Sequence, residues 1–386
     1  MAILQEEIAA HGPVTYARFM ELALYHPVWG YYTRPVDQDE RPRIGPSGDF
    51  YTSADVHPGL GWALAAQIEQ VDRLLESPST LTVVEIGAGK GLLARDILRA
   101  CASRFPALFS RLTYVLIDRS PAHRAAQRTN LAPWLAIPNR VQWLDSLDAA
   151  PPNSITGVVL SNELVDAFPV HRVQMTGGTL VEHRVSVRDG RLVMATGPVS
   201  TPDLPAYFER LGLSLPDGAI ADVNLHAIEW IAAVAARLAR GLVITIDYGH
   251  TAQDLFGPER PHGTLRSYAR HRVSDRILDA VGQQDLTSHV DFTSLAQAGR
   301  RAGLALAGFT NQMCVLVSLD IESYCATLPE ESPELVAIAH LMRPHGMGTT
   351  FKVLFQHKGL PPGVLDGLRH TPFFESSLDA PAAERS

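Results

Sequence analysis

One stretch of the chain combines a carboxylate with three glycines at the spacing of a nucleotide-binding turn: the sequence of residues 85–92 is EIGAGKGL. It follows the apolar run LTVV and leads directly into a helical pattern. Glycines at a strand-to-helix turn permit a tight bend, and they let a ligand approach the backbone beside a helix N-terminus. We therefore expect Gly87, Gly89 and Gly91 to face a small-molecule ligand.

Two phosphate-binding patterns do not fit this turn. A phosphate loop requires G-x-x-x-x-G-K-[ST], but Lys90 is followed by glycine and Val84 occupies the position of the first glycine. A dinucleotide fingerprint requires a sixth-position glycine, where this chain has Leu92. Glu85 would repel a diphosphate but would suit the cationic methionine part of S-adenosylmethionine. The remaining pattern, E-x-G-x-G-x-G, resembles motif I of class I S-adenosylmethionine-dependent methyltransferases.

Acidic residues also follow the next two predicted strands. Asp118 ends the run TYVLID, where a carboxylate can accept hydrogen bonds from both ribose hydroxyls. Asp145 follows RVQWL and is placed to meet an adenine amino group. Alternatively, both are ordinary polar residues at strand ends.

The fourth predicted strand leads into SNELVDAFP, where an acceptor is expected to bind at the carboxyl edge of the sheet. Glu163 and Asp166 could hold a guanidinium group by charge-assisted hydrogen bonds, and their spacing can place both on one helix face. Asn162 could instead orient a neutral amide or amine. The alternative for the two acids is that they complement the dipole of a helix N-terminus.

A histidine lies between two carboxylates in DLTSHVD, residues 285–291. The pKa of such a histidine can cross neutrality, so His289 is a candidate proton shuttle or acceptor-positioning group. An equally good alternative is a hydrogen-bonded loop histidine. Asp247 beside Tyr248 and Gly249 has the same ambiguity, because an Asp next to a glycine can simply build a turn. No histidine spacing predicts a metal site.

The segment 48–53, GDFYTS, precedes a predicted helix at 57–76 and is a candidate lid over the cofactor. Asp49 and Thr52 are its candidate cofactor contacts. Phe50, Tyr51 and Thr52 would supply an apolar wall and hydroxyl contacts to the ligand. Ser53 with Asp55 is the predicted helix cap. The alternative is an ordinary helix entry that packs against the core.

Composition excludes several classes of protein. The 386 residues carry 33 Lys and Arg against 41 Asp and Glu, a net charge of −8, which argues against a nucleic-acid-binding protein. Three cysteines without C-x-x-C spacing predict neither a disulfide framework nor a zinc ribbon. We expect no signal or transit peptide, no membrane span and a cytoplasmic, bacterial location.

The order of the predicted elements indicates an α/β fold. Short apolar strands alternate with helices from Leu81 onward, which predicts a doubly wound parallel sheet. Turns at TGG and RDG predict hairpins between about 171 and 200. The predicted divisions are an N-terminal helical cap or lid (1–80), the first half of a Rossmann-like core (81–170), a hairpin and helix insertion (171–225), the second half of the core (226–358) with a polar substrate-side segment (250–292), and a tail with little order (359–386).

Several segments together resemble one family, the MidA-like methyltransferases. They span residues 20 to about 354 and include MELALYHPVWGYY, SGDFYTSADVHPGLGWALAAQ, SNELVDAFPVHRV, LVITIDYGH, GTLRSYARHR and QDLTSHVDF. The resemblance implies a class I Rossmann-like fold that binds S-adenosyl-L-methionine. It also implies a protein substrate, because the mitochondrial relative dimethylates an arginine of a respiratory complex I subunit. This chain departs from the family at SDRILDAVGQQDLT, which affects the predicted substrate side more than the cofactor side.

The leading hypothesis is therefore a protein arginine methyltransferase linked to complex I assembly. The alternatives are an assembly chaperone that binds S-adenosylmethionine without turnover, and a methyltransferase with another acceptor. An NAD-dependent oxidoreductase is disfavoured by Leu92 and Glu85. The oligomeric state and the number of methyl groups transferred stay open.

Overall fold

A mixed sheet forms the centre of the computed structural model, which describes residues 2–34, 45, 48–49, 52–269, 272–372 and 378. Its strand order is β15-β16-β10-β5-β2-β3-β4, with β14 paired to β10. Their bounds are β2 (Leu81–Ile86), β3 (Leu112–Ile117), β4 (Val141–Leu144), β5 (Ile155–Asn162), β10 (Leu238–His250), β14 (Val290–Asp291), β15 (Ala305–Asn311) and β16 (Phe351–Lys358).

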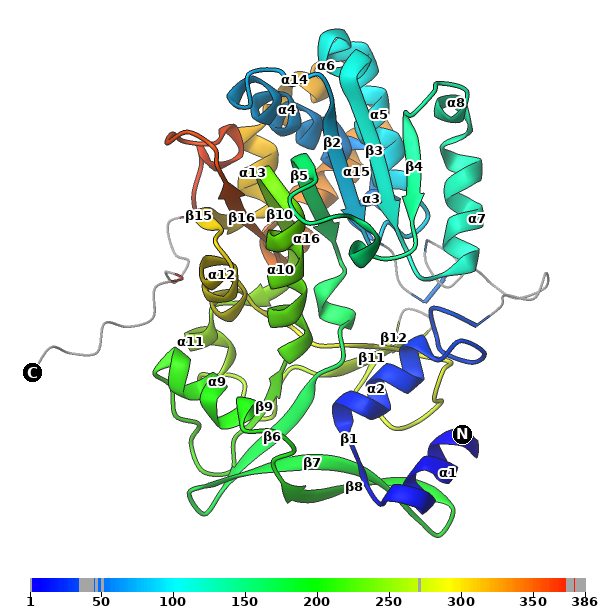
Figure 1. Ribbon diagram of the computed structural model, residues 1–386, viewed down its shortest axis with the longest axis vertical. Helices are drawn as coiled ribbons and strands as arrows, with labels where there is room; N and C mark the ends of the chain where they lie inside the picture. The colour runs from blue at the N-terminus through cyan, green and yellow to red at the C-terminus, as the bar shows by residue number, and fades with distance from the viewer. Residues whose placement is uncertain are drawn as a thin grey trace, which may run out of the picture.

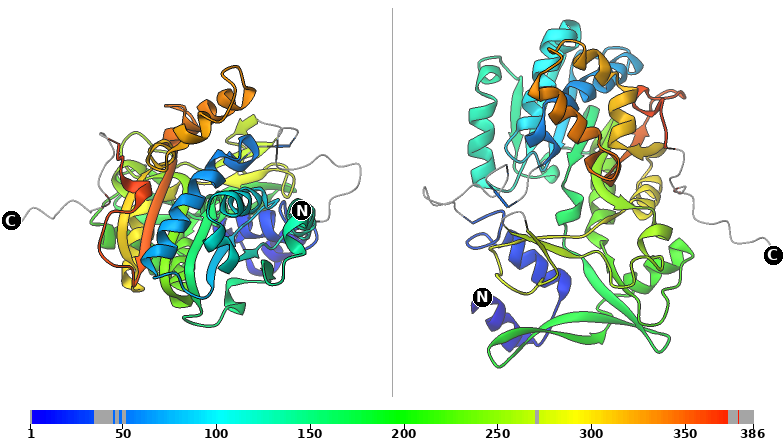
Figure 2. Two further views of the ribbon diagram at one scale, coloured as in Figure 1. Left: turned by 90° about the horizontal axis from the view of Figure 1, so that it is seen from above. Right: turned by 180° about the vertical axis from the view of Figure 1, so that it is seen from behind.

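Helices cover both faces of this sheet, so the predicted doubly wound α/β fold is confirmed (Figures 1 and 2). Successive side chains alternate between two cores: Val83 packs with the first layer and Val84 with the second. This two-sided burial explains why the strands are almost continuously apolar. The first layer contains α4 (Gly59–Leu74), α5 (Leu92–Arg104), α13 (Gln312–Ser318) and α15 (Pro333–Met342); the second contains α10 (Leu225–Arg237) and α12 (Phe292–Arg301).

The sheet is not entirely parallel. β16 runs antiparallel to both β10 and β15. The helices after β15 return the chain to the edge where that strand ends, so Asn311 pairs with Lys352. Two separate helices, α14 (Ile321–Cys325) and α15, lie between β15 and β16.

The predicted hairpins are confirmed in a second sheet, which Figure 1 shows below the central one. Their turns have φ of 57° and 75° at Gly177 and Gly178, and of 52° and 72° at Asp189 and Gly190, as two-residue hairpin turns require. This sheet contains β1 (Val14–Thr15), β6 (His171–Thr176), β7 (Thr179–Arg188), β8 (Arg191–Pro198) and β9 (Ile220–Val223); α1 (Ala2–His11), α2 (Tyr16–Tyr25) and α9 (Asp203–Leu211) complete the region.

The segment 250–292, although polar overall, contributes side chains to the core. Leu265, Leu286 and Val290 are buried, because its strands turn their few apolar side chains inward. A third sheet of order β12-β11-β13 forms here from β11 (Arg266–Ala269), β12 (Arg272–Ser274) and β13 (Asp285–Thr287), and α11 (Ala252–Leu255) precedes it.

Two further expectations need correction. The first part of the tail, residues 360–372, packs against the core: Leu365 is buried, and the Gln67 side-chain oxygen accepts a hydrogen bond from the Gly367 N–H (2.9 Å). The helix cap before α3 (Ser53–Val56) is Thr52 rather than Ser53, since Thr52 and Asp55 form a reciprocal capping box. Among the described residues, no helix is long and apolar enough to cross a bilayer. The division of the chain into five parts stays a prediction.

Candidate functional site

A pocket of about 770 Å³ lies at the carboxyl ends of β2, β3, β4 and β5. Its opposite wall comes from α2, β11 and β13. Ten of the predicted site residues line it: Glu85, Gly87, Gly89, Asp118, Asp145, Thr52, Asn162, Glu163, Asp166 and His289. Gly91 and Asp49 do not; Gly91 is the N-cap of α5, and the Asp49 carboxylate accepts a hydrogen bond from the Tyr31 hydroxyl (2.9 Å). Phe50 and Tyr51 lie outside the described residues.

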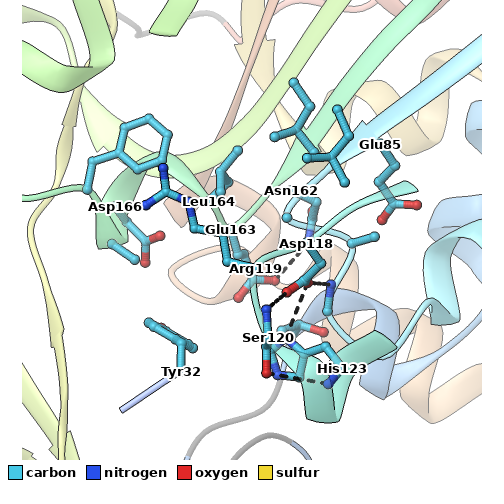
Figure 3. Close-up of a pocket in the computed structure, with 18 of the residues that line it drawn as sticks. Tyr32, Glu85, Asp118, Arg119, Ser120, His123, Asn162, Glu163, Leu164 and Asp166 are labelled. Atoms are coloured by element: carbon cyan, nitrogen blue, oxygen red, sulfur yellow. Dashed lines mark hydrogen bonds and ion pairs between the residues drawn. The ribbon is translucent and has the colours of Figure 1, made fainter. Parts of the chain in front are cut away.

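The pocket has two ends. Figure 3 shows Glu85, Asp118, Ser120 and His123 on one side, and Asp166 with Tyr32 on the other. Glu163 lies between the two groups. This arrangement separates the glycine turn from the acidic residues near β13.

The glycine turn is open toward the pocket. Gly87 and Gly89 have φ of 73° and 50°, a conformation that side chains disfavour. A Cβ on Gly87 would lie 2.7 Å from Cδ1 of Leu164, whereas one on Gly89 would meet no protein atom within 4 Å. The turn is held to the next strand because the Gly89 N–H donates to Oδ2 of Asp118 (2.9 Å). Gly89 therefore offers the free surface that a ligand needs to approach the backbone.

Asp118 is the centre of a small polar cluster. Its Oδ1 accepts a hydrogen bond from the Ser120 N–H (2.8 Å), and His123 Nδ1 lies 3.2 Å from its Oδ2. Ser120 also caps α7 (Pro121–Asn130). A serine followed by proline is typical of a helix start, so the sequence could have indicated that Ser120 lies at this strand-to-helix turn. Each carboxylate oxygen can accept more than one hydrogen bond, so Asp118 retains capacity for a hydroxyl.

Glu85 and Asp145 differ sharply in environment. Glu85 is only 3% exposed, and its Oε2 accepts a hydrogen bond from the Tyr114 hydroxyl (2.7 Å). Burial raises the pKa of Glu85 to about 8. The Asp145 side chain is 93% exposed and pairs with Arg124 (2.8 Å) at the rim. A buried carboxylate such as Glu85 gains most from a cationic ligand.

Glu163 occupies a strained backbone conformation between β5 and a single 3₁₀ turn, Val165–Ala167. Its φ is 53°, which costs about 1–3 kcal/mol in a non-glycine residue. The α-helix expected after β5 is therefore absent from this turn, and the shared helix face predicted for Glu163 and Asp166 is wrong. Oε1 of Glu163 accepts hydrogen bonds from the Ser53 N–H (2.9 Å) and from Asn162 Nδ2 (3.2 Å). Burial raises the pKa of Glu163 to about 8.

Asp247 holds this turn in place, which favours the structural alternative stated for it, although the turn follows β5 and not its own strand. Its fully buried Oδ2 accepts hydrogen bonds from the N–H groups of Leu164 (3.2 Å), Val165 (2.8 Å) and Asp166 (3.3 Å). Burial, followed by the charges of Asp166 and Glu163, raises the pKa of Asp247 well above its usual range. Three amides on one carboxylate oxygen fix the backbone that presents Glu163.

Asp166 is buried against a tyrosine. The Tyr248 hydroxyl donates to its Oδ2, while its Oδ1 is buried and has no hydrogen-bond partner among the described residues. Burial raises the pKa of Asp166 to about 6. The Oδ1 atom of Asn162 is also buried and has no hydrogen-bond partner among the described residues. Unpartnered buried oxygens that line a pocket indicate a missing donor.

The imidazole of His289 lines the pocket. Burial and the charges of Arg260 and Arg266 lower its pKa to about 4, and its Nδ1 has no described partner. Its predicted position between two carboxylates is wrong, because Asp291 instead caps α12 and accepts a hydrogen bond from Tyr207 (2.6 Å). Asp285 likewise turns away and accepts a hydrogen bond from Tyr32.

Sequence reasoning missed the aromatic wall of the pocket. Tyr25, Tyr32, Tyr248 and Tyr268 all line it, and the rings of Tyr25 and Tyr32 stack with centroids 5.7 Å apart. The adjacent tyrosines in GYY, residues 30–32, were a visible signal, but nothing in the sequence connects them to residues 285–287. Within the described ranges, no group of three or more His, Cys, Asp or Glu side chains could hold a metal ion.

Comparisons with known proteins agree on one class of enzyme. Residues 63–310 match a family model described as "Putative S-adenosyl-L-methionine-dependent methyltransferase". A crystal structure of a Burkholderia thailandensis protein bound to S-adenosyl-homocysteine superposes with a TM-score of 0.86 at 32% identity, covering 96% of this chain and 94% of that one. Curated relatives include the mitochondrial protein arginine methyltransferase NDUFAF7 of Homo sapiens (25% identity, 93% of this chain and 84% of the relative) and its Drosophila melanogaster homologue (28%, 94% and 86%).

Proposed function

The chain belongs to this family of S-adenosyl-L-methionine-dependent methyltransferases, and we propose that it methylates arginine side chains of a protein. The predicted resemblance, enzyme class and cofactor are thereby confirmed. The arginine acceptor is our inference from the carboxylates Glu163 and Asp166 at the end of β5. The names of the curated relatives, which are protein arginine methyltransferases, support it.

The residues at the glycine end fit the cofactor chemically. S-adenosyl-L-methionine supplies a methyl group already activated by its sulfonium. Gly87 and Gly89 would face its amino-acid end, Asp118 would accept from its ribose hydroxyls, and the buried Glu85 would balance its positive charge. We propose rim contacts from Asp145 near the adenine and from Thr52 of the N-terminal segment.

Gly89→Ala is expected to weaken binding of S-adenosyl-homocysteine by about tenfold or more, because the new methyl group occupies space reserved for the ligand. The substitution also costs about 1 kcal/mol of stability, since alanine disfavours positive φ. Gly178→Ala is a matched control: it has φ of 75° and open space around it, but it lies in a hairpin turn. Calorimetry should show normal affinity for the control; equal affinity for both variants would contradict the placement of the cofactor.

At the other end, the chain provides charge and position for the acceptor. Glu163 and Asp166 would localise the guanidinium charge on the nitrogen that does not react. Asn162 Oδ1 would orient the reacting nitrogen, and His289 would help to position the acceptor beside it. Ser53 connects the N-terminal segment to Glu163, so closure of this segment would exclude water from the site.

The value of kcat/KM for the acceptor is expected to rise with pH between about 6 and 8. Burial raises the pKa of Asp166 to about 6 and that of Glu163 to about 8, so each carboxyl keeps its proton below that pH. A protonated carboxyl cannot pair with a guanidinium, and the site gains its charges as the pH rises. Initial rates at saturating cofactor measure this; a kcat/KM that falls over the same interval would contradict the role of the carboxylates.

The direct test uses methyl-labelled S-adenosyl-L-methionine and extract from cells that lack the protein. Acid hydrolysis of the labelled proteins should yield methylated arginine together with S-adenosyl-homocysteine. Label on another residue type would identify a different acceptor, and binding without turnover would indicate an assembly chaperone. The family resemblance makes a subunit of respiratory complex I the first acceptor to examine, in a cytoplasmic, bacterial setting.

A further inference from the structure

Two carboxylate–tyrosine pairs lie at the end of the pocket opposite the glycine turn, which we call the acceptor end. Tyr248 donates to Oδ2 of Asp166, and Tyr32 donates to Oδ1 of Asp285 (2.8 Å). All four residues line the pocket. The segments that carry the carboxylates are joined, since the Ser288 N–H donates to the carbonyl oxygen of Asp166 (2.9 Å).

Each carboxylate leaves one oxygen for a ligand. Oδ1 of Asp166 is buried without a described partner, and the residue is only 5% exposed. Oδ1 of Asp285 accepts from Tyr32 and from the Leu286 N–H (2.9 Å), whereas no described residue donates to its Oδ2. Asp285 is 2% exposed. Two buried carboxylates thus retain one free acceptor atom each at the same end of the pocket.

Among the residues that the structure describes, no cation forms an ion pair with either of these two carboxylates. Arg119 lines the pocket, but its guanidinium lies over the Tyr25 ring, 5.8 Å from the centroid, and forms no ion pair with a described carboxylate. Burial, followed by the charge of Asp166, raises the pKa of Asp285 to about 7. Buried carboxylates without a cation are costly, which a cationic ligand would relieve.

We propose that Asp285 and Asp166 together bind the acceptor guanidinium, through Oδ2 and Oδ1 respectively, and that Asp285 selects arginine over neutral acceptors. The planar fork of a guanidinium can donate to two separate oxygens, and its face can stack on the Tyr32 ring, which a lysine ammonium does less well. This assignment rests on the proposed function and adds a specificity residue from β13 to the carboxylates of β5.

The test measures binding of a Gly-Arg-Gly peptide and of its neutral Gly-citrulline-Gly counterpart by NMR titration at saturating S-adenosyl-homocysteine. Wild-type protein should bind the arginine peptide at least tenfold more tightly than the citrulline peptide. Asp285→Asn should lose about tenfold or more of the arginine affinity and keep the citrulline affinity. Tyr32→Phe should lose less of the arginine affinity, because it removes only the hydrogen bond to Oδ1 of Asp285 and leaves Oδ2 for the ligand.

Asp279→Asn is the matched control, since Asp279 is exposed on the same segment and does not line the pocket. Unchanged affinity for S-adenosyl-homocysteine shows that each variant is folded. Arginine affinity within twofold of wild type in Asp285→Asn would overturn this inference alone. A wild-type protein that prefers citrulline and labels no arginine in extract would overturn the proposed function as well.

Discussion

Glu163→Gln is expected to reduce kcat for methyl transfer by about 10²–10³-fold while S-adenosyl-homocysteine binds with nearly unchanged affinity. The carboxylate lies between the glycine end and the acceptor end of the pocket (Figure 3). Glutamine keeps the acceptor oxygen for Ser53 and Asn162, so the substitution removes the charge with little change in shape. Steady-state kinetics and calorimetry on the same preparation separate the two effects.

The variant is also expected to be at least as stable as the wild type at pH 8. The folded-state pKa of Glu163 is raised to about 8, above its value in the unfolded chain. Its ionisation therefore lowers the stability of the fold as the pH rises from the unfolded-state pKa to about 8. The amide removes that penalty. Glu209→Gln, at an exposed position on α9, controls for a general effect of lost charge. A Glu163→Gln enzyme with kcat near that of the wild type would contradict the assigned role.

Asp247→Ala is expected to lower the free energy of unfolding by about 3–5 kcal/mol and to abolish activity. The substitution leaves three N–H groups, at residues 164–166, without their acceptor, and two of them, at residues 165 and 166, are buried. The strained φ of Glu163 then loses the contacts that hold it. Urea unfolding measures the first effect.

Asp247→Asn separates charge from hydrogen bonding. Asparagine retains a carbonyl oxygen for the amides, and the raised pKa of Asp247 means that its charge stabilises nothing by itself. Its unfolding free energy should therefore lie much closer to that of the wild type. An alanine variant within about 1 kcal/mol of the wild type would refute the positioning role of Asp247.

The grouping of residues at the glycine turn could be predicted from the sequence, because that end of the pocket is built from local segments. Gly87 and Gly89 stand in one turn, and Asp118 ends the adjacent strand, so a parallel sheet brings them together without further information. The hairpins were equally local, since the turn residues at 177–178 and 189–190 fix their register.

The acceptor end could not be predicted in the same way. Tyr32 and Asp285 are 253 positions apart, and their contact depends on how β13 packs beside α2 and the turn at residues 165–167. Asp247 was visible as a strand-end residue, but its three amide donors belong to a turn that follows a different strand. A helix was expected at that turn because acidic residues suit a helix N-terminus, whereas the Asp247 carboxylate stabilises a tighter conformation.

The most direct test of arginine methylation by this protein compares methylated peptides by mass spectrometry from cells with the wild-type protein, without it, and with Glu163→Gln in its place. We expect at least one methylarginine mark to be present with the wild-type protein and missing in both other strains. If every methylarginine mark persists without the protein, or if the only lost mark lies on another residue type, arginine methylation by this chain is contradicted.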